Sequence, residues 1–258
     1  MITYDGAEAR KTDRAYMTPD VTRQRMRTLE ALRLQAEESV IDIGCGSGLL
    51  AENMAALVSE GGRVVGVDSS PDMLALAERR CADLPQVRLK EGRAEDLLEE
   101  SESFDAVACI QVLLYISAVE SALAEMHRVL KPGGRLVILE TDWRGTVLNS
   151  SDDALTRKIL AAWDADVASP NLPLRLGPLL KARGFAALGV EAFPIVNTSG
   201  SPGNFSMGML EQFTDLARAQ GAVARNEIET WLEDLRRKDA EGAYFFCVNR
   251  FIFSAVKV

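Results

Sequence analysis

Acidic side chains and glycines at alternate positions carry the clearest chemical signal in the sequence. An apolar run leads into Asp42, Gly44, Gly46 and Gly48. The glycines let the backbone turn sharply from a strand into a helix, and they let a ligand lie against the chain. Asp68 ends the next apolar run, where its carboxylate can accept hydrogen bonds from two ribose hydroxyls. The pattern therefore predicts a site for a ligand that contains an adenosine-type ribose.

The spacing of the glycines narrows the choice of ligand. Dinucleotide-binding loops read G-x-G-x-x-G, with a helix N-terminus facing a pyrophosphate, whereas this chain reads G-x-G-x-G. The carboxylate of Asp42 would repel a pyrophosphate, but it suits a ligand that carries ammonium and sulfonium charges. S-adenosylmethionine is a ligand of that kind. A nicotinamide-dependent oxidoreductase stays open as an alternative, and so does a regulatory protein that binds S-adenosylmethionine without catalysis.

Four further segments follow the glycine loop in a characteristic order. With that loop, they are residues 40–48, 64–74, 91–97, 103–107 and 128–136. Together they resemble the class I S-adenosylmethionine-dependent methyltransferases, in particular the branch of ubiquinone and menaquinone biosynthesis enzymes and small-molecule methyltransferases. The resemblance covers residues 37–142. It implies a doubly wound, Rossmann-like α/β fold whose seven-stranded mixed sheet ends in an antiparallel strand, and S-adenosylmethionine as the cofactor.

The resemblance also implies contacts to the cofactor. The three glycines would face its methionine and ribose portions. Further predicted contacts beyond the strand ends and in the N-terminal segment are Ser69, Met73, Ala94, Glu95, Gln111, Tyr16 and Arg25. Ser69 and Met73 would flank the adenine, and Ala94 and Glu95 would meet its amine edge. Gln111 would hold the methionine end of the cofactor. Tyr16 and Arg25 would close on its carboxylate. Met73 could instead be helix core, Glu95 a helix-terminal acid, and Arg25 a surface ion pair.

Residues on the acceptor side carry a weaker signal. The predicted reaction is direct in-line transfer of a methyl group to a nitrogen, an oxygen or a carbon atom of a small organic acceptor. Asp142, just after the fifth predicted strand, could orient or deprotonate the acceptor, or it could cap a turn; Tyr115 is a second catalytic candidate. The candidates for substrate binding are Trp143, Asn197, Phe205 and Asn249. The one histidine, His127, lies in a helical apolar stripe and is predicted to be structural.

The elements that must position these residues alternate as in a doubly wound sheet. Strands are predicted at residues 39–43, 63–68, 86–91, 104–110 and 134–141, with helices near 49–59, 71–83 and 118–130. The pattern then changes, with helices at 152–168, 173–183, 205–219 and 225–238 and extended segments at 186–196 and 243–256. We therefore expect four regions: a helical lid (1–36), a cofactor-binding core (37–196), a helical cap over the substrate site (197–240) and a final antiparallel strand (241–258).

Composition excludes several other functions. The chain has 29 basic and 38 acidic residues, a net charge of −9, which disfavours nucleic acid as a partner. No apolar run approaches the roughly 20 residues of a membrane span. Four scattered cysteines and a single histidine predict reduced thiols and no metal site, as expected of a cytoplasmic protein. The exposed faces of the cap could support a homodimer.

Overall fold

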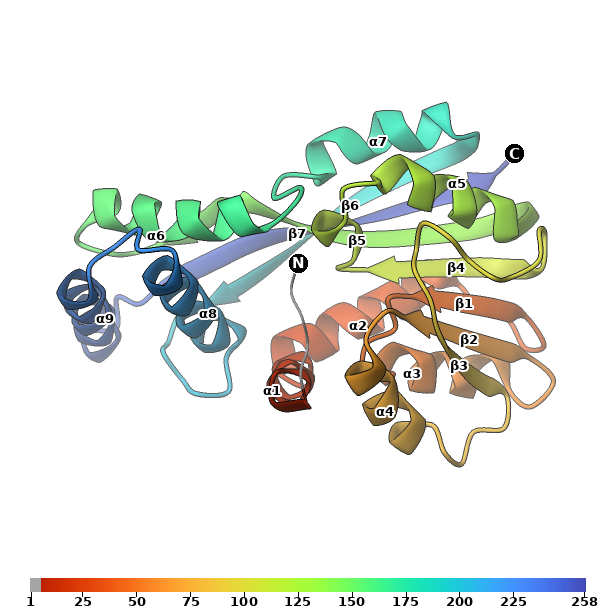
Figure 1. The fold of residues 1–258 in the computed structure, drawn as a ribbon, viewed down its shortest axis with the longest axis horizontal. Coiled ribbons are helices and arrows are strands. Elements are labelled where there is room, and N and C mark those ends of the chain that lie inside the picture. The colour runs from red at the N-terminus through yellow and green to blue at the C-terminus, as the bar shows by residue number, and fades with distance from the viewer. Residues whose placement is uncertain (1–5) are drawn as a thin grey trace.

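The computed structural model describes residues 6–258 and contains one seven-stranded sheet. Its strand order is β3-β2-β1-β4-β5-β7-β6, and β7 runs antiparallel to both of its neighbours (Figure 1). The strands are β1 (Ser39–Ile43), β2 (Arg63–Asp68), β3 (Val87–Glu91), β4 (Phe104–Ile110), β5 (Leu130–Leu148), β6 (Phe185–Asn197) and β7 (Phe246–Lys257). The predicted mixed sheet with an antiparallel last strand is confirmed.

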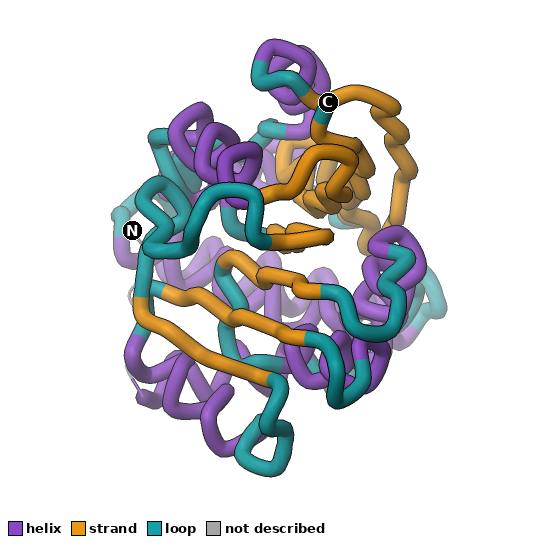
Figure 2. Tube along the Cα trace, turned by 90° about the vertical axis from the view of Figure 1, so that its right-hand side faces the viewer, coloured by secondary structure: helices purple, strands orange, loops and turns teal. Residues whose placement is uncertain are grey.

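Helices pack against both sides of this sheet, as Figure 2 shows. They are α1 (Gly6–Tyr16), α2 (Pro19–Leu32), α3 (Leu49–Val58), α4 (Pro71–Arg80), the 3-10 helix η1 (Leu113–Tyr115), α5 (Val119–Val129), α6 (Asp153–Asp166), α7 (Pro173–Ala182), α8 (Phe205–Ala219) and α9 (Arg225–Ala240). The predicted helices are present, with ends that differ by a few residues. Of the predicted lid, residues 1–5 lie outside the described part of the chain.

The central strands are apolar because both of their faces are buried. In β4, Val107 and Cys109 belong to a core that includes side chains of α5 and α7. Ala106 and Ala108, on the opposite face, belong to a core shared with α2 and α3. This explains why the parallel strands read as continuous apolar runs rather than as an alternation of apolar and polar residues.

The sheet extends beyond the carboxyl ends of β1 to β4, where β5 and β7 continue as an arm (Figure 1). Helices α6, α8 and α9 pack on this arm around a second core. Its centre holds Trp143, Trp163 and Phe213, whose ring centroids lie 5.2 to 5.9 Å apart with edge-on geometry. The insertion between β6 and β7 therefore packs on the arm, and its predicted role as a cap over the substrate site stays a prediction.

The fifth strand is longer than predicted. The expected strand ended at Thr141, but β5 continues to Leu148, with an irregular pairing between Asp142 and Val147. It continues because β7 is long enough to pair with it beyond the rest of the sheet. Asp142 therefore lies within the strand, opposite Asn249, rather than in a loop after it.

Within residues 6–258, no helix is long and apolar enough to cross a membrane. The same residues hold no group of three or more His, Cys, Asp or Glu side chains that could bind a metal ion.

Candidate functional site

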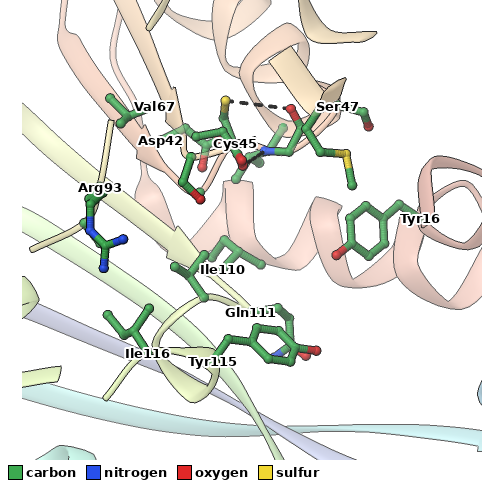
Figure 3. Close-up of a pocket in the computed structure, with 18 of the residues that line it drawn as sticks. Tyr16, Asp42, Cys45, Ser47, Val67, Arg93, Ile110, Gln111, Tyr115 and Ile116 are labelled. Carbon is green, nitrogen blue, oxygen red and sulfur yellow. Dashed lines mark hydrogen bonds between the residues drawn. The ribbon is translucent and has the colours of Figure 1, made fainter. Parts of the chain in front are cut away.

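A cavity of about 490 Å³ lies at the carboxyl ends of the parallel strands. This volume is in the range of pockets that hold small molecules. One half, the cofactor half, is formed by the loops that follow β1, β2, β3 and β4. The other, the acceptor half, is formed by Tyr16 of α1, Val21 and Gln24 of α2, η1, residues 165–168 and β7. Tyr16 and Tyr115 of this half are labelled in Figure 3. Arg25 of α2 lies on the side of the glycine loop, because it contacts Asn53 of α3.

The glycine loop brings backbone to the cavity wall. The N–H groups of Gly44 and Cys45 donate to the carbonyl oxygen of Val67, at 2.7 and 3.0 Å, and so tie the loop to β2. Gly44 has a φ of +73°, and a Cβ there would overlap Cγ2 of Val112. A Cβ on Gly46 would meet only the ring of Tyr16, at an ordinary van der Waals distance of 3.8 Å. Only glycine fits the first position, and the second leaves room for a ligand.

Gly48 has a different role from the other two glycines. It does not line the cavity but precedes α3 with a φ of +81°, and a Cβ there would lie 2.9 Å from Cβ of Ala77 in α4. Its lack of a side chain allows α3 and α4 to approach each other. The prediction that Gly48 contacts a cofactor therefore gains no support from its position.

The carboxylate of Asp68 is held in place by the loops on either side of it. One oxygen accepts a hydrogen bond from the N–H of Gly46 at 2.8 Å, and the other accepts one from the N–H of Ser70 at 2.9 Å. Burial raises the pKa of Asp68, and these backbone donors oppose that effect. Each carboxylate oxygen can accept a further bond, so Asp68 is fixed in the cavity wall and can still bind a ligand.

Asp42 is a second, more deeply buried carboxylate in the same wall. It is 2% exposed, and its Oδ2 has no hydrogen-bond partner among the described residues. Burial, together with the negative charge of Asp68, raises the pKa of Asp42 to about 7. An orphaned buried oxygen of this kind is rare and calls for a partner. A positively charged ligand in the cavity would supply one.

The remaining predicted cofactor contacts also line the cavity: Ser69, Met73, Ala94, Glu95, Gln111, Tyr16 and Arg25. Ile110 lies beside them in the lining. Glu95 forms an ion pair with Arg93 at 2.8 Å. Arg25 donates from Nε to the side chain of Asn53 at 3.0 Å and from Nη1 to the carbonyl of Tyr16 at 3.2 Å. Residues that are far apart in sequence therefore surround one space, and their contacts with a cofactor stay predictions.

Gln111 and Glu140 shape the turn between the two halves of the cavity. Gln111 has a φ of +59°, and its Oε1 accepts a hydrogen bond from the hydroxyl of Thr141 at 2.6 Å. Buried Glu140 accepts hydrogen bonds from the N–H groups of Val112 and Leu113, at 3.2 and 2.8 Å. Burial raises the pKa of Glu140 to about 8. These bonds hold η1, and with it the ring of Tyr115.

The acceptor half contains polar side chains that the sequence analysis did not select. Tyr115, predicted from the sequence, is joined there by Gln24, Asp166 and Arg250. Sequence patterns could have indicated that two of them, Gln24 and Arg250, are buried polar residues. In α2, Gln24 lies four residues from two other buried polar residues, Asp20 and Thr28. In β7, alternation places Arg250 on the same side as buried apolar residues.

Five residues predicted for the acceptor side do not line the cavity: Asp142, Trp143, Asn197, Phe205 and Asn249. Trp143 lies in the second core. Asn197 donates to the side chain of Asp20 at 2.9 Å and accepts from the N–H of Ser206 at 2.9 Å, which ties the insertion to α2. The ring of Phe205 packs against the guanidinium of Arg250, which itself lines the cavity. Their predicted contacts with substrate gain no support from these positions.

Comparison with known proteins adds an independent finding. Residues 41–138 match the family model described as a methyltransferase domain. An uncharacterised 37.1 kDa protein in transposon TN4556 of Streptomyces fradiae is 32% identical over 228 residues, which cover 88% of this chain and 65% of that protein. The demethylmenaquinone methyltransferase of Oceanobacillus iheyensis is 36% identical over 116 residues, covering 44% of this chain and 49% of the enzyme. The chain thus spans less than two thirds of each relative.

One solved structure extends the similarity to nearly the whole chain. Phosphoethanolamine N-methyltransferase 2 of Haemonchus contortus, in complex with S-adenosyl-L-methionine, matches with a TM-score of 0.64 and 20% sequence identity. The match covers 98% of this chain and 57% of that one. At this level of identity, the likeness shows the fold.

Proposed function

We propose that the protein transfers a methyl group from S-adenosylmethionine to a small organic acceptor. The match of residues 41–138 to the methyltransferase domain model supports this proposal and agrees with the sequence motifs. One observation carries the proposal. The side-chain-free loop at Gly44 and Gly46 lies beside two carboxylates, Asp42 and Asp68, in the wall of a single cavity.

The cofactor half fits a cationic adenosine derivative better than a dinucleotide. Asp68 is fixed by backbone donors and would accept the ribose hydroxyls. The orphaned oxygen of Asp42 would face the positive charge of the ligand. A pyrophosphate would place negative charge beside both carboxylates, which is unfavourable in a buried site. Glu95 would meet the adenine edge and Arg25 the carboxylate of the methionine portion.

In the proposed reaction the residues of the chain position the two reactants and exclude water. When bound, the cofactor would supply a methyl group on a positively charged sulfur. Tyr16 and Tyr115 line the acceptor half and would orient the acceptor in line with that methyl group. Of the carboxylates near the acceptor half, Asp166 lines the cavity and Asp142 does not. We therefore infer that Asp166 is better placed than Asp142 to accept a proton from an acidic acceptor.

Calorimetry with S-adenosylhomocysteine tests the cofactor assignment. We expect Asp68→Ala to weaken binding at least 30-fold, because two hydrogen bonds to a charged group are lost. Asp72→Ala, an exposed acid in the first turn of α4, is the matched control and should stay within threefold of the parent. Equal affinity of Asp68→Ala and the parent would refute the ribose assignment. Tighter binding of NADH than of S-adenosylhomocysteine would favour the oxidoreductase alternative.

A second experiment separates an enzyme from a binding protein. The purified protein is incubated with S-adenosylmethionine and a panel of amines, phenols and carboxylic acids, and methylated products are detected by mass spectrometry. Methylation of at least one compound class is expected. Micromolar cofactor affinity without any methylated product would instead favour a regulatory protein.

We also propose that the protein is located in the cytoplasm. All four cysteines are free, and burial raises the pKa of the thiols of Cys45 and Cys109, which makes them unreactive. Unpaired cysteines of this kind suit a reducing compartment.

A further inference from the structure

Arg250 is a buried cation in the acceptor half of the cavity. The residue is 4% exposed and lines the cavity from β7. Its Nη1 donates a hydrogen bond to Oε1 of Gln24, and its Cζ lies 4.6 Å from the centroid of the Phe205 ring. Within the described part of the chain, its buried Nε has no hydrogen-bond partner, and no carboxylate forms an ion pair with it.

The acidic groups that act on Arg250 from neighbouring elements are engaged elsewhere. Glu140 of β5 bonds to backbone N–H groups of η1, and because its pKa is about 8, most of its carboxyl is neutral at pH 7. Asp20 of α2 forms an ion pair with Arg23 at 2.7 Å. Neither of these carboxyl groups therefore forms an ion pair with the guanidinium.

A buried charge without a counter-ion is costly, and it normally pairs with an opposite charge. The penalty is several kcal/mol per ion in general. Loss of the proton does not remove this cost, because the pKa of Arg250, lowered by burial to about 10, still leaves it charged at neutral pH. Guanidinium groups match carboxylates and other oxyanions in geometry and bind them through paired N–H donors. An anion in the acceptor half would compensate the charge of Arg250 and offer an acceptor to its unpartnered Nε.

Two other cations of the described chain line the cavity, Arg25 and Arg93. Arg93 follows β3 and forms an ion pair with Glu95 at 2.8 Å. Arg25 of α2 contacts Asn53 of α3, beside the glycine loop. Arg250 pairs in register with Thr141 of β5, beside the turn that leads to Tyr115. Arg25 is therefore the arginine on the side of the glycine loop, where the carboxylate of the cofactor would lie. Arg250 is left for the other reactant.

We propose that the methyl acceptor is an organic acid whose carboxylate or ionised hydroxyl binds Arg250, next to the rings of Tyr16 and Tyr115. The inference rests on the proposed function and names the substrate class of the same site. Val21 and Val167 also line the cavity and would contact the apolar part of the acceptor. The site thus selects for an anionic group attached to a flat or apolar body.

Calorimetry on the protein saturated with S-adenosylhomocysteine tests this inference. The probes are matched pairs of single-ring acids and amides: benzoate and benzamide, salicylate and salicylamide, 4-hydroxybenzoate and 4-hydroxybenzamide. We expect at least one acid to bind at least tenfold more tightly than its amide. Arg250→Gln should remove this preference and keep the affinity for S-adenosylhomocysteine within threefold. Arg250→Lys, which keeps the charge, should retain part of it.

Arg157→Gln is the matched control, because Arg157 is exposed on α6 and does not line the cavity. It should bind every probe as the parent does. If no acid binds better than its amide, or if Arg250→Gln retains the preference, the inference is wrong. A tenfold loss of S-adenosylhomocysteine affinity in Arg250→Gln would assign Arg250 to the cofactor carboxylate and also overturn it.

Two further readouts keep the test decisive. If Arg250→Gln lacks a cooperative thermal transition, the acid–amide comparison on the parent and the Arg250→Lys variant decide the question. If S-adenosylhomocysteine does not bind the parent at all, the proposed function fails as well. Cofactor binding without any acid preference would refute the substrate class alone.

Discussion

The two halves of the cavity differ in charge and in the origin of their residues. In the cofactor half, Asp42 and Asp68 place negative charge beside backbone N–H groups, and both lie at the ends of adjacent strands. In the acceptor half, Arg250 places positive charge among residues from α1, α2, η1 and the segment 165–168. The buried charges of the first half suit a cation and that of the second suits an anion, because Asp166 in the second half is exposed and Arg93 in the first is paired with Glu95. Two reactants of opposite charge would therefore bind side by side without competing for the same half.

The comparison also shows two ways to satisfy buried polar groups. Asp68 is satisfied locally, by the N–H groups of two loops. Arg250 depends on a hydrogen bond to Gln24, which is 226 positions away in sequence, and on one aromatic ring. A change in the glycine loop should therefore damage the fold and the cofactor half together. Changes in the acceptor half should mainly alter selectivity.

Gly44→Ala should break the cofactor half most severely. A Cβ would overlap Val112, and the φ of +73° is unfavourable for alanine. We expect a loss of about 3 kcal/mol in the free energy of unfolding, typical of overpacking with backbone strain. Affinity for S-adenosylhomocysteine should fall more than 100-fold. Gly208→Ala in α8, where a Cβ meets nothing within 4 Å, is the control and should not destabilise the protein. Similar urea midpoints for the two variants would contradict this account.

Glu140→Ala should destabilise the turn that joins the two halves of the cavity. The backbone N–H groups of Val112 and Leu113 would lose their acceptor inside the protein. Leaving buried donors unsatisfied costs about 1–3 kcal/mol each, so we expect the loss of both bonds to lower the free energy of unfolding by about 2–6 kcal/mol. Glu140→Gln keeps an acceptor oxygen and should lose less than about half of that at pH 7, where the native carboxyl is mostly neutral. Equal losses in the two variants, measured by urea unfolding, would argue against this role of Glu140.

Asp42 should give the ligand-free protein a specific pH dependence. Its folded pKa of about 7 lies above its ordinary value of 3.8, so the folded state binds the proton more tightly than the unfolded state. Its contribution to stability is therefore fully present below about pH 4 and is lost as the pH rises through 7. The slope from this group is about −1.4 kcal/mol per pH unit between these values.

Urea unfolding of the parent and of Asp42→Asn between pH 5 and pH 8 measures this effect. The difference between the two curves isolates the carboxyl from other groups that titrate in the same range. Asp72→Asn, which changes an exposed acid, should follow the parent. Parallel curves for the parent and Asp42→Asn would mean that Asp42 titrates near its ordinary value.

Asp142→Asn should have little effect on methyl transfer. The side chain lies in β5 opposite Asn249, outside the cavity lining. We expect kcat within about threefold of the parent, whereas Asp166→Asn should lower kcat about tenfold or more for an acceptor that must lose a proton, in line with the usual size of general-base effects. A 100-fold loss in Asp142→Asn would restore this residue as the base that the sequence suggested.

Local sequence was sufficient for the fold and for most of the cofactor half. Short apolar runs, a capped start at Ser70 and Pro71, and glycines that require positive φ define the strands and turns through contacts within a few residues. Because parallel strands end at one edge of the sheet, the acids and glycines that follow β1 and β2 must meet there. No long-range information is needed to place Asp42, Gly44 and Asp68 together.

The acceptor half depended on long-range packing. β5 extends past Thr141 because it pairs with β7, and this pairing takes Asp142 and Trp143 away from the cavity. The same pairing carries Arg250 into the cavity, where Gln24 from the other end of the chain meets it. Periodicity shows which face of a strand or helix is buried, but it does not show which distant element covers that face. In this protein, the identity of the covering element decides whether a buried position lies in the core or lines the acceptor half of the cavity.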